Sequence, residues 1–323
     1  MEGDSLKVAL FGGTGFVGSY IVDELVSREH KPRLLVRPGS EGKVSKPEYC
    51  ETVSGDIHDD YAIRETLYDC DAAIYLIAVI REFSKEGITN ELLQFRGAQR
   101  AANIALEVGV KRFLLMSALG TSCWPGASKY FKAKHLAEQA VKNTELSWTI
   151  LRPSSIFGDP RGFGRPEFCT MLNKDMLNLI PFPGFLPFPA PSFFTGLNPF
   201  NAGSFSLSMI HAADVATLVA NVLDDDTAIG KTLELGGKQE MSWNEIIKAI
   251  ASSSGKKIFM MPVPFFAVWL VALMLDRFIW FPATRDQLQD LVQGNTCNSR
   301  ELFKQYSIEP IPFSVENMDY LSK

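Results

Sequence analysis

Apolar residues in the first half of the chain follow two alternating patterns. Short, largely apolar stretches predict strands buried in a sheet, and they lie at residues 8–11, 33–37, 52–54, 72–79 and 112–117. Between them apolar residues recur every three or four positions, which predicts helices at residues 16–26 and 90–108. This regular succession of strands and helices predicts an α/β fold with a doubly wound parallel sheet and right-handed crossovers.

The second half of the chain contains long stretches without charge. Residues 176–210 carry no charged side chain, and phenylalanine and proline recur throughout them. Because proline interrupts regular helices, we expect an irregular apolar loop here, either buried between lobes or facing a lipid or protein partner. Residues 258–275 are also uncharged, but Pro262 and Pro264 leave only Phe265–Leu275 to form a helix of about 16 Å. Such a helix is too short to span a bilayer and suits its interface.

These patterns predict two domains. Residues 1–158 are expected to form the Rossmann-type sheet domain, and residues 159–323 a smaller, partly irregular substrate lobe that faces a membrane. A segment around residues 207–223 is expected to pack back on the first domain. Within it, Asp214 is interpreted as the cap of a following helix and His211 as a structural residue.

A glycine-rich turn follows the first predicted strand. Gly12, Gly15 and Gly18 stand between that strand and the first predicted helix. Strand, glycine turn and helix in this order are typical of dinucleotide binding, with the amides of the helix N-terminus facing the pyrophosphate. Gly12 allows the tight turn, Gly15 lets the backbone approach the pyrophosphate, and Gly18 lets the helix pack closely on the strand. The sequence therefore predicts a dinucleotide site near the N-terminus.

Two residues at later strand ends are candidate contacts of the dinucleotide. Arg37 lies nineteen residues after Gly18, about where an NAD-binding fold carries an acidic residue for the ribose hydroxyls. An arginine there can pair with a 2′-phosphate instead, so the sequence favours NADP(H) and leaves NAD(H) open. Asp56, which follows the third strand, is placed either to meet the adenine amino group or to cap the next helix.

Candidate chemistry lies at the same edge of the predicted sheet. Ligands of doubly wound sheets bind beyond the carboxyl ends of the strands, which here end near Gly12, Ala78, Ser117 and Pro153. Tyr130 and Lys134 are one helical turn apart, so the lysine ammonium can stabilise a phenolate. The phenol can then exchange a proton with a carbonyl or an alcohol, while Ser117, thirteen residues earlier, holds the substrate oxygen.

Several motifs in the chain resemble those of extended or atypical short-chain dehydrogenases/reductases. They are Gly12–Gly18, Gly55–Ile57, Ser117–Gly120, Tyr130–Lys134 and Trp148–Gly158. Three further segments resemble the branch named for the NAD(P)-binding accessory subunit nine of respiratory complex I, and they are Met209–Ala216, Leu235–Gly237 and Thr284–Leu288. The resemblance therefore covers nearly the whole chain.

This resemblance implies a set of cofactor contacts and a set of catalytic positions. The residues expected at the dinucleotide are Gly12, Thr14, Gly15, Phe16, Val17, Gly18, Arg37, Asp56, Ile57, Ala78, Lys134, Pro153, Ser155 and Ile156. The reductase triad positions are occupied by Ser117, Tyr130 and Lys134. The chain departs from the family at Gln94, where an asparagine usually braces the active site. Members of this branch also include proteins that hold NADP(H) without evident turnover.

Charge and cysteine content restrict the other classes of site. A net charge of −5 gives no electrostatic reason to expect nucleic-acid binding. The five cysteines are scattered and include no C-x-x-C pair, so we expect reduced thiols in a cytosolic compartment and no metal site. The acidic N-terminus runs directly into the first strand, and no signal or transit peptide is expected. We therefore expect a cytoplasmic protein, peripheral on the inner membrane face.

Three functions fit these observations. The first is an NADP(H)-binding reductase-like protein that acts on or senses a lipophilic molecule, such as a quinone or isoprenoid, at a membrane face. The second is a non-catalytic NADP(H)-binding subunit of a respiratory or quinone-biosynthetic complex, which gives the chain a protein partner. The third is a soluble nucleotide-sugar epimerase or dehydratase. The uncharged residues 176–210 argue against the third, because a diphosphate needs basic partners.

Overall fold

The computed structural model describes residues 5–121, 126–162, 164–177, 187–275 and 284–322. The chain forms two compact units, which are described separately. The first unit comprises residues 1–153, 212–235 and 301–308, and the second comprises residues 154–211, 236–300 and 309–323.

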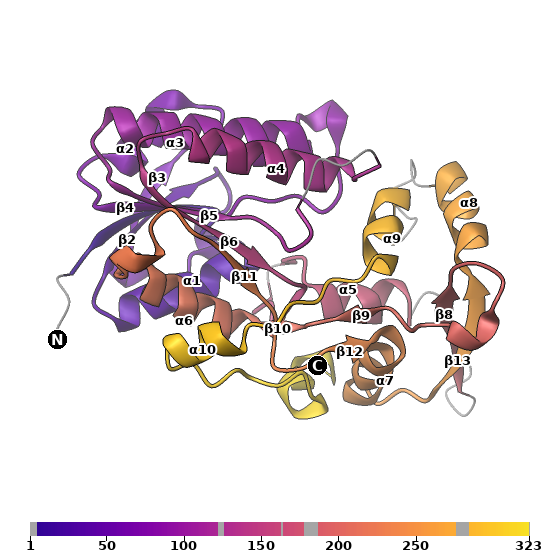
Figure 1. The fold of residues 1–323 in the computed structure, drawn as a ribbon. Helices are drawn as coiled ribbons and strands as arrows, with labels where there is room; N and C mark the ends of the chain where they lie inside the picture. Colours follow the sequence, from indigo (N-terminus) through magenta and orange to yellow (C-terminus); the bar gives the residue numbers. More distant parts are fainter. Residues whose placement is uncertain (1–4, 122–125, 163, 178–186, 276–283, 323) are drawn as a thin grey trace. The chain divides into compact units, whose positions relative to one another are not determined.

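The first unit is built on a seven-stranded sheet in which every pair of neighbouring strands is parallel (Figure 1). In sheet order the strands are β3 (Glu51–Ser54), β2 (Lys31–Val36), β1 (Lys7–Phe11), β4 (Ala72–Tyr75), β5 (Arg112–Met116), β6 (Ser147–Pro153) and β11 (Thr232–Leu235). The chain builds outward from β1 in one direction and then from β4 in the other. The predicted doubly wound parallel sheet is therefore confirmed, and the strand order reverses between β1 and β4.

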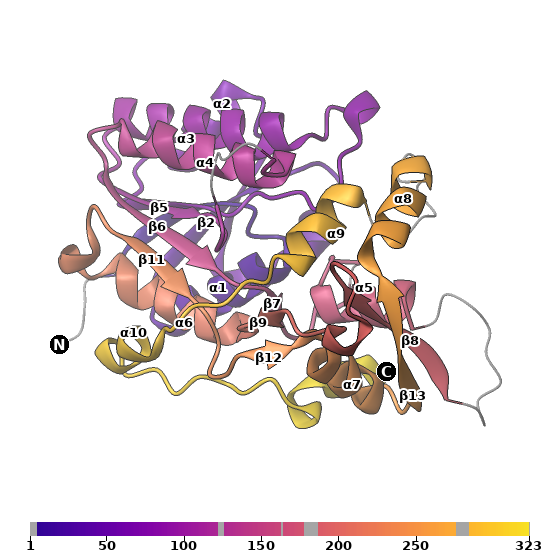
Figure 2. The same cartoon turned by 45° about the vertical axis from the view of Figure 1, so that its right-hand side comes forward.

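Helices cover both faces of this sheet (Figures 1 and 2). One face carries α2 (Asp60–Leu67), α3 (Gly97–Glu107) and α4 (Lys129–Lys142), and the other carries α1 (Phe16–Ser27) and α6 (Ala212–Leu223). On α3 a row of buried alanines lies at the helical spacing of three and four, which lets the helix approach the sheet closely; they are Ala98, Ala101, Ala102 and Ala105. Arg28 at the end of α1 donates to Asn221 of α6 at 2.7 Å and joins the two helices of the second face.

Two predicted elements of this unit have different bounds in the structure. The strand predicted at 72–79 ends at Tyr75, because the chain then crosses the glycine turn, where a Cβ on Gly12 would lie 3.2 Å from the Ile77 nitrogen. The helix predicted at 90–108 begins as a π-helical turn, Glu91–Arg96, before α3. The Tyr75 hydroxyl donates to the Leu93 carbonyl inside this turn, which accounts for the wider helix there.

The second unit consists of short strand pairs and helices around its own core. The paired strands are β7 (Ile156–Phe157) with β10 (Ile210–His211), β8 (Phe188–Phe194) with β13 (Ile258–Pro264), and β9 (Ser206–Leu207) with β12 (Met241–Ser242). The helices are α5 (Phe168–Asp175), α7 (Trp243–Ser253), α8 (Phe265–Leu275) and α9 (Arg285–Val292), with α10 (Arg300–Gln305) leading back into the first unit. Trp243 is fully buried and packs against the rings of Phe193 and Phe205, so it centres this core.

The expectation of an irregular loop over residues 176–210 is wrong for the part that forms β8. This strand pairs in parallel with β13, and Phe188 donates its backbone N–H to the Lys257 carbonyl at 2.7 Å. Alternate residues of a parallel pair direct their N–H groups away from the partner, so Pro189 and Pro191 remove no bond from the ladder. Residues 178–186 of the predicted loop lie outside the described residues.

The helix that Asp214 was expected to cap begins earlier, at Ala212. Asp214 is therefore the third residue of α6 and not its cap, which corrects the interpretation made from the sequence. The helix predicted over Phe265–Leu275 is confirmed as α8, and residues 276–283 beyond it lie outside the described residues.

Candidate dinucleotide and catalytic site

The glycine turn after β1 forms a cradle that only glycine can build. Gly12 has a φ of +98°, a region that favours glycine, and its carbonyl accepts the Gly15 N–H at 3.1 Å. A Cβ on Gly18 would overlap the Gly12 carbonyl oxygen and come within 2.8 Å of the Gly13 Cα. Helix α1 starts at Phe16 with no side-chain cap and no acidic residue in its first turn. This arrangement fits a pyrophosphate, which would accept hydrogen bonds from those amides.

This cradle lies where the strand order of the sheet reverses. The Leu76 N–H donates to the Phe11 carbonyl at 2.9 Å, so the segment after β4 runs beside the end of β1. Ala78, which follows in that segment, is exposed at the carboxyl edge of the sheet. In doubly wound folds the ligand crevice opens at this reversal, and the predicted positions Gly12 and Ala78 therefore belong to one region.

The ends of β2 and β3 place Arg37 and Asp56 at the same edge. The Gly55 N–H donates to the Val36 carbonyl at 3.0 Å, which brings the two strand ends side by side. Arg37 is exposed, and its guanidinium makes no ion pair with any residue that the structure describes. Its cationic end is therefore available to an anionic ligand.

Asp56 does not cap helix α2, which was one of its two predicted roles. The cap is Asp59, whose carboxylate accepts the Tyr61 N–H at 2.9 Å and the Ala62 N–H at 3.3 Å. One oxygen of Asp56 accepts the His58 N–H at 3.0 Å, and a contact of this carboxylate with adenine stays a prediction.

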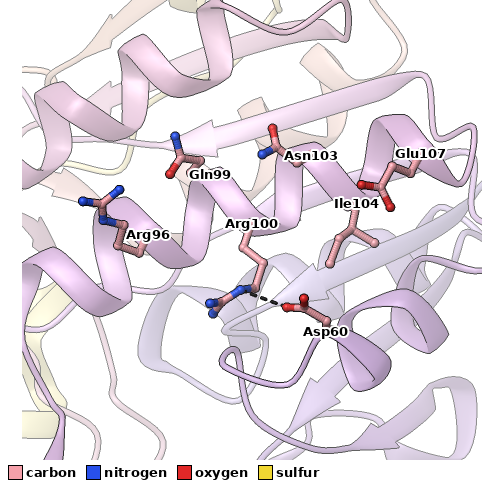
Figure 3. A pocket seen from close by; sticks show the side chains of 7 residues that line it. All are labelled: Asp60, Arg96, Gln99, Arg100, Asn103, Ile104 and Glu107. Carbon is pink, nitrogen blue, oxygen red and sulfur yellow. Dashed lines mark ion pairs between the residues drawn. The ribbon is translucent and has the colours of Figure 1, made fainter.

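A shallow hollow of about 290 Å³ lies along the outer side of α2 and α3 (Figure 3). Its main feature is Arg100, which pairs with Asp60 at 2.9 Å and donates to the Ile57 carbonyl at 3.1 Å. Arg100 thus ties α3 to the loop that carries Asp56. The hollow itself is lined by helix surfaces and is not the crevice at the strand ends.

Tyr130 and Lys134 lie together near the start of α4. Ser128 caps the helix by accepting the Phe131 N–H at 3.2 Å. Lys134 is almost completely buried, its Nζ donates to the Met116 carbonyl at 2.7 Å, and it lies 5.9 Å from the centre of the Tyr130 ring. Burial lowers the pKa of Lys134 to about 7, although the nearby carboxylate of Glu138 opposes this shift.

The hydroxyl of Ser117 is directed at a buried carboxylate. Ser117 donates to Glu138 at 2.5 Å and also lies 3.2 Å from the Thr121 hydroxyl, which itself donates to the Ala118 carbonyl at 2.6 Å. A serine hydroxyl can donate one hydrogen bond, and Ser117 donates it to Glu138. The predicted role of Ser117 in holding a substrate oxygen stays a prediction. In the structure the hydroxyl donates its hydrogen bond to Glu138.

Glu138 and Arg152 are two residues of this site that the sequence analysis did not single out. The Arg152 guanidinium donates to both carboxylate oxygens of Glu138, at 2.8 and 2.7 Å, and Lys142 lies 3.7 Å from the same carboxylate. The spacing of Tyr130, Lys134 and Glu138 at successive intervals of four was a signal for a shared helix face. The partner Arg152 is distant in sequence and gave no such signal.

Gln94, at the position of the usual asparagine brace, is buried in the π-helical turn. Its amide donates to the Asn90 side chain, whose own amide and backbone N–H both donate to Glu82, at 3.2 and 2.9 Å. Glu82 in turn pairs with Lys129 at 3.2 Å. This chain of polar contacts connects the segment after β4 with the first residue of α4.

Two of the predicted cofactor residues, Ser155 and Ile156, belong to the second unit, whereas Pro153 ends β6 in the first. Ser155 accepts the Ile210 N–H at 3.1 Å, and Ile156 pairs with Ile210 in the β7–β10 ladder. These bonds fix the backbone that follows Pro153, and the predicted contacts of Ser155 and Ile156 with the dinucleotide stay predictions.

His211 is held in the uncharged form. Burial, and to a smaller extent the charge of Arg161, lowers the pKa of His211 to about 4. Its ring meets the Phe157 ring edge-on at 5.0 Å between centroids. These contacts favour the structural interpretation of His211.

The described part of the chain also bears on metal binding and on membrane crossing. Those residues include no cluster of three or more histidine, cysteine, aspartate or glutamate side chains that could hold a metal ion. None of the helices that the structure describes has the length and apolar character needed to cross a membrane.

Comparison with known proteins agrees with the geometry of the first unit. A family profile described as NAD(P)H-binding matches residues 12–167. The chain is 28% identical over 254 residues to subunit 9 of the mitochondrial NADH dehydrogenase (ubiquinone) 1 alpha subcomplex of Arabidopsis thaliana, covering 75% of this chain and 56% of that protein. It is 32% identical over 151 residues to a ceramide reductase of Caulobacter vibrioides, covering 47% and 46% of the two chains. The chain thus spans about half the length of these two relatives.

Among solved structures, the UDP-glucose 4-epimerase of Thermus thermophilus in complex with NAD is similar over almost the entire chain. The TM-score is 0.71 at 16% identity, with 98% of each chain covered. At this level of identity the likeness establishes the fold alone, a Rossmann-type sheet unit followed by a second unit.

Proposed function

Because this chain is an extended short-chain dehydrogenase/reductase similar to the complex I subunit nine proteins, we propose that it binds NADP(H) and carries out a reductase-type reaction on a lipophilic molecule. The observation that carries the proposal is the glycine cradle at the reversal of strand order, together with the buried Lys134 beside Tyr130.

The residues of the cradle fit a dinucleotide in shape and charge. Gly12, Gly15 and Gly18 leave space for a pyrophosphate that any Cβ at Gly18 would remove by pushing α1 away. Arg37, exposed at the end of β2, supplies a cation for a 2′-phosphate, and this supports NADP(H) over NAD(H). The carboxylate of Asp56 supports recognition of the adenine amino group from the neighbouring strand end.

The chemistry proposed for this site is proton exchange at the Tyr130 hydroxyl. Bound NADP(H) would supply or accept the hydride. Lys134, with its ammonium fixed by the Met116 carbonyl, stabilises negative charge on the Tyr130 oxygen, so this phenol can give a proton to a carbonyl oxygen or take one from an alcohol. Tyr130 is half-buried, so part of its side chain is exposed.

The proposal is tested by the variant Tyr130→Phe with quinone, ketone and alcohol substrates. We expect Tyr130→Phe to lower turnover by at least about a hundredfold, because general acid–base catalysis contributes about that much, while NADPH affinity changes little. Lys134→Ala should lower both the turnover and the affinity for NADPH. Substantial turnover by Tyr130→Phe would exclude the proposed proton donor.

The second unit supports a lipophilic substrate and a position at a membrane surface. Helix α8 has no polar residue, and of its side chains only Ala272 is buried. Phe266 and Met274 are each 65% exposed, and the adjoining strand β13 exposes Phe259. An apolar helix of this length can lie in the headgroup region without crossing the bilayer, which supports peripheral attachment.

A second candidate function is that of a non-catalytic NADP(H)-binding subunit in a respiratory or quinone-biosynthetic complex. It is favoured by the likeness to a protein named as a complex I subunit and by the Ser117 hydroxyl, whose proton goes to Glu138. Firm NADPH binding with no turnover on any tested quinone, ketone or alcohol would support this function over the first. An epimerase function is disfavoured by the uncharged residues 176–210.

A further inference from the structure

Glu138 is a fully buried carboxylate that the proposed chemistry does not use. It lies one turn beyond Lys134 on α4, so Tyr130, Lys134 and Glu138 form one row on the helix face that meets the sheet. A buried carboxylate is costly unless charged and hydrogen-bonded partners surround it. The partners of Glu138 therefore show what its presence achieves.

These partners join three elements at one point. Ser117, the residue after β5, donates to Glu138 at 2.5 Å, and Arg152 on β6 donates to it twice. The Ser117 N–H also donates to the Leu151 carbonyl at 2.7 Å, so the end of β5 is fixed to β6 as well. The carbonyl that holds the Lys134 ammonium belongs to Met116, the residue directly before Ser117.

We infer that Glu138 is a positioning residue of the dinucleotide site, which acts through Lys134. By holding Ser117 it fixes the neighbouring Met116 carbonyl that aims the Lys134 ammonium, and its negative charge favours the protonated lysine. The inference rests on the proposed function, in which Lys134 contacts the dinucleotide.

The charges around Lys134 make this effect measurable. On its own helix the ionisable neighbours are Tyr130 and Glu138, and Arg152 of β6 is bound to Glu138. Strand β5 presents the Met116 carbonyl. The π-helical turn and α3 also pack against α4, and the buried residues of both are uncharged. Burial lowers the pKa of Lys134 to about 7, and Glu138 is the group that opposes it. Lys134 is thus charged below about pH 7 and loses its charge above it, so dinucleotide affinity should fall as the pH rises.

The test is a calorimetric titration of the full chain with NADP⁺ across this pH range. We expect wild-type affinity to begin falling near pH 7. In Glu138→Gln the fall should begin about one unit lower, because one opposite charge near the lysine is lost, while affinity at the lowest pH stays within about twofold. Glu234→Gln is the matched control, since Glu234 also pairs with Arg152, at 3.6 Å, and is half-exposed; its profile should follow the wild type.

A merely structural role for Glu138 predicts something different. Glu138→Gln would then weaken binding equally at every pH, and that result, or an unmoved onset, overturns the inference. Should Glu138→Gln fail to fold, Ser117→Ala tests the positioning step alone: it should lower affinity about fivefold at all pH values without moving the onset, and unchanged affinity would contradict the inference. Absence of NADP⁺ binding by the wild type would instead overturn the proposed function.

Discussion

At the scale of single residues, the site depends on places where backbone atoms come closer than a side chain allows. Gly18 is the strictest of these, because a Cβ there would strike backbone atoms of Gly12 and Gly13, which cannot rotate away. At Arg37 and Lys134 the requirement is the opposite, because the proposed function needs a charged side chain at these positions. In the proposed function the cradle would hold the pyrophosphate, Arg37 would select NADP(H), and Lys134 would orient the dinucleotide.

Gly18→Ala should therefore separate helix α1 from the glycine turn. We expect dinucleotide affinity to fall at least about tenfold and the free energy of unfolding to fall by about 1–3 kcal/mol, the usual cost of overpacking. Calorimetry and thermal unfolding measure the two effects. Gly42→Ala is the control, since a Cβ there would have nothing within 4 Å. If Gly18→Ala binds like Gly42→Ala, the cradle is not the pyrophosphate site.

Single residues of the site also show which contacts can be predicted from the sequence and which cannot. The glycine spacing and the Tyr130–Lys134 pair are local patterns, and the structure forms them as the sequence predicts. The Glu138–Arg152 pair joins positions fourteen residues apart on a helix and a strand, and only the packing of α4 on the sheet brings them together. The direction of the Ser117 hydroxyl follows from that packing, so spacing alone could not predict its partner.

At the scale of elements, helix α8 and strand β13 form an apolar segment of the second unit. Helix α8 packs against β13 and α9, and β13 pairs along its whole length with β8. A helix that is apolar on every side is normally surrounded by protein or lipid, but five of the eleven side chains of α8 are exposed in the described part of the chain. This is the structural reason to expect a bilayer surface here.

Flotation with liposomes that contain anionic lipid tests this expectation. The wild type should float, since each apolar side chain of this size that enters lipid contributes about 1.5–3 kcal/mol. Phe266→Asp combined with Met274→Asp should release the protein while NADP⁺ binding persists. The control is Tyr61→Asp on α2, an aromatic residue that is 73% exposed in the first unit. A wild type that stays in the soluble fraction, with or without anionic lipid, contradicts membrane attachment.

The same scale explains which elements could be predicted. The five strands β1 to β5 and helix α8 have uninterrupted patterns, and they appear within a few residues of the expected bounds, whereas no bounds were predicted for β6 and β11. Strand β8 was missed because its prolines suggest a loop, and only its pairing with β13 shows that they fall where no backbone donor is needed. The π-helical turn depends on the Tyr75 hydroxyl reaching Leu93, a tertiary contact that periodicity does not reveal.

At the scale of the whole molecule, the two units divide the proposed work. The first unit carries the cradle, Arg37 and the Tyr130–Lys134 pair, and its fold is that of known NAD-binding proteins. The second unit contributes the uncharged stretches and the exposed apolar helix. The proposed function combines a redox cofactor site with an apolar surface. Both candidate functions, the enzyme and the accessory subunit, require that the protein binds the cofactor.

The most direct test of the proposed cofactor site is a calorimetric titration of the full chain with NADPH and with NADH, for the wild type and Arg37→Glu. We expect the wild type to bind NADPH at least about tenfold more tightly than NADH, since one charge-assisted bond to a phosphate contributes about 1.5–3 kcal/mol. Arg37→Glu should abolish or reverse this preference. Equal wild-type affinities would contradict the NADP assignment, and failure of both nucleotides to bind would contradict the proposed dinucleotide site itself.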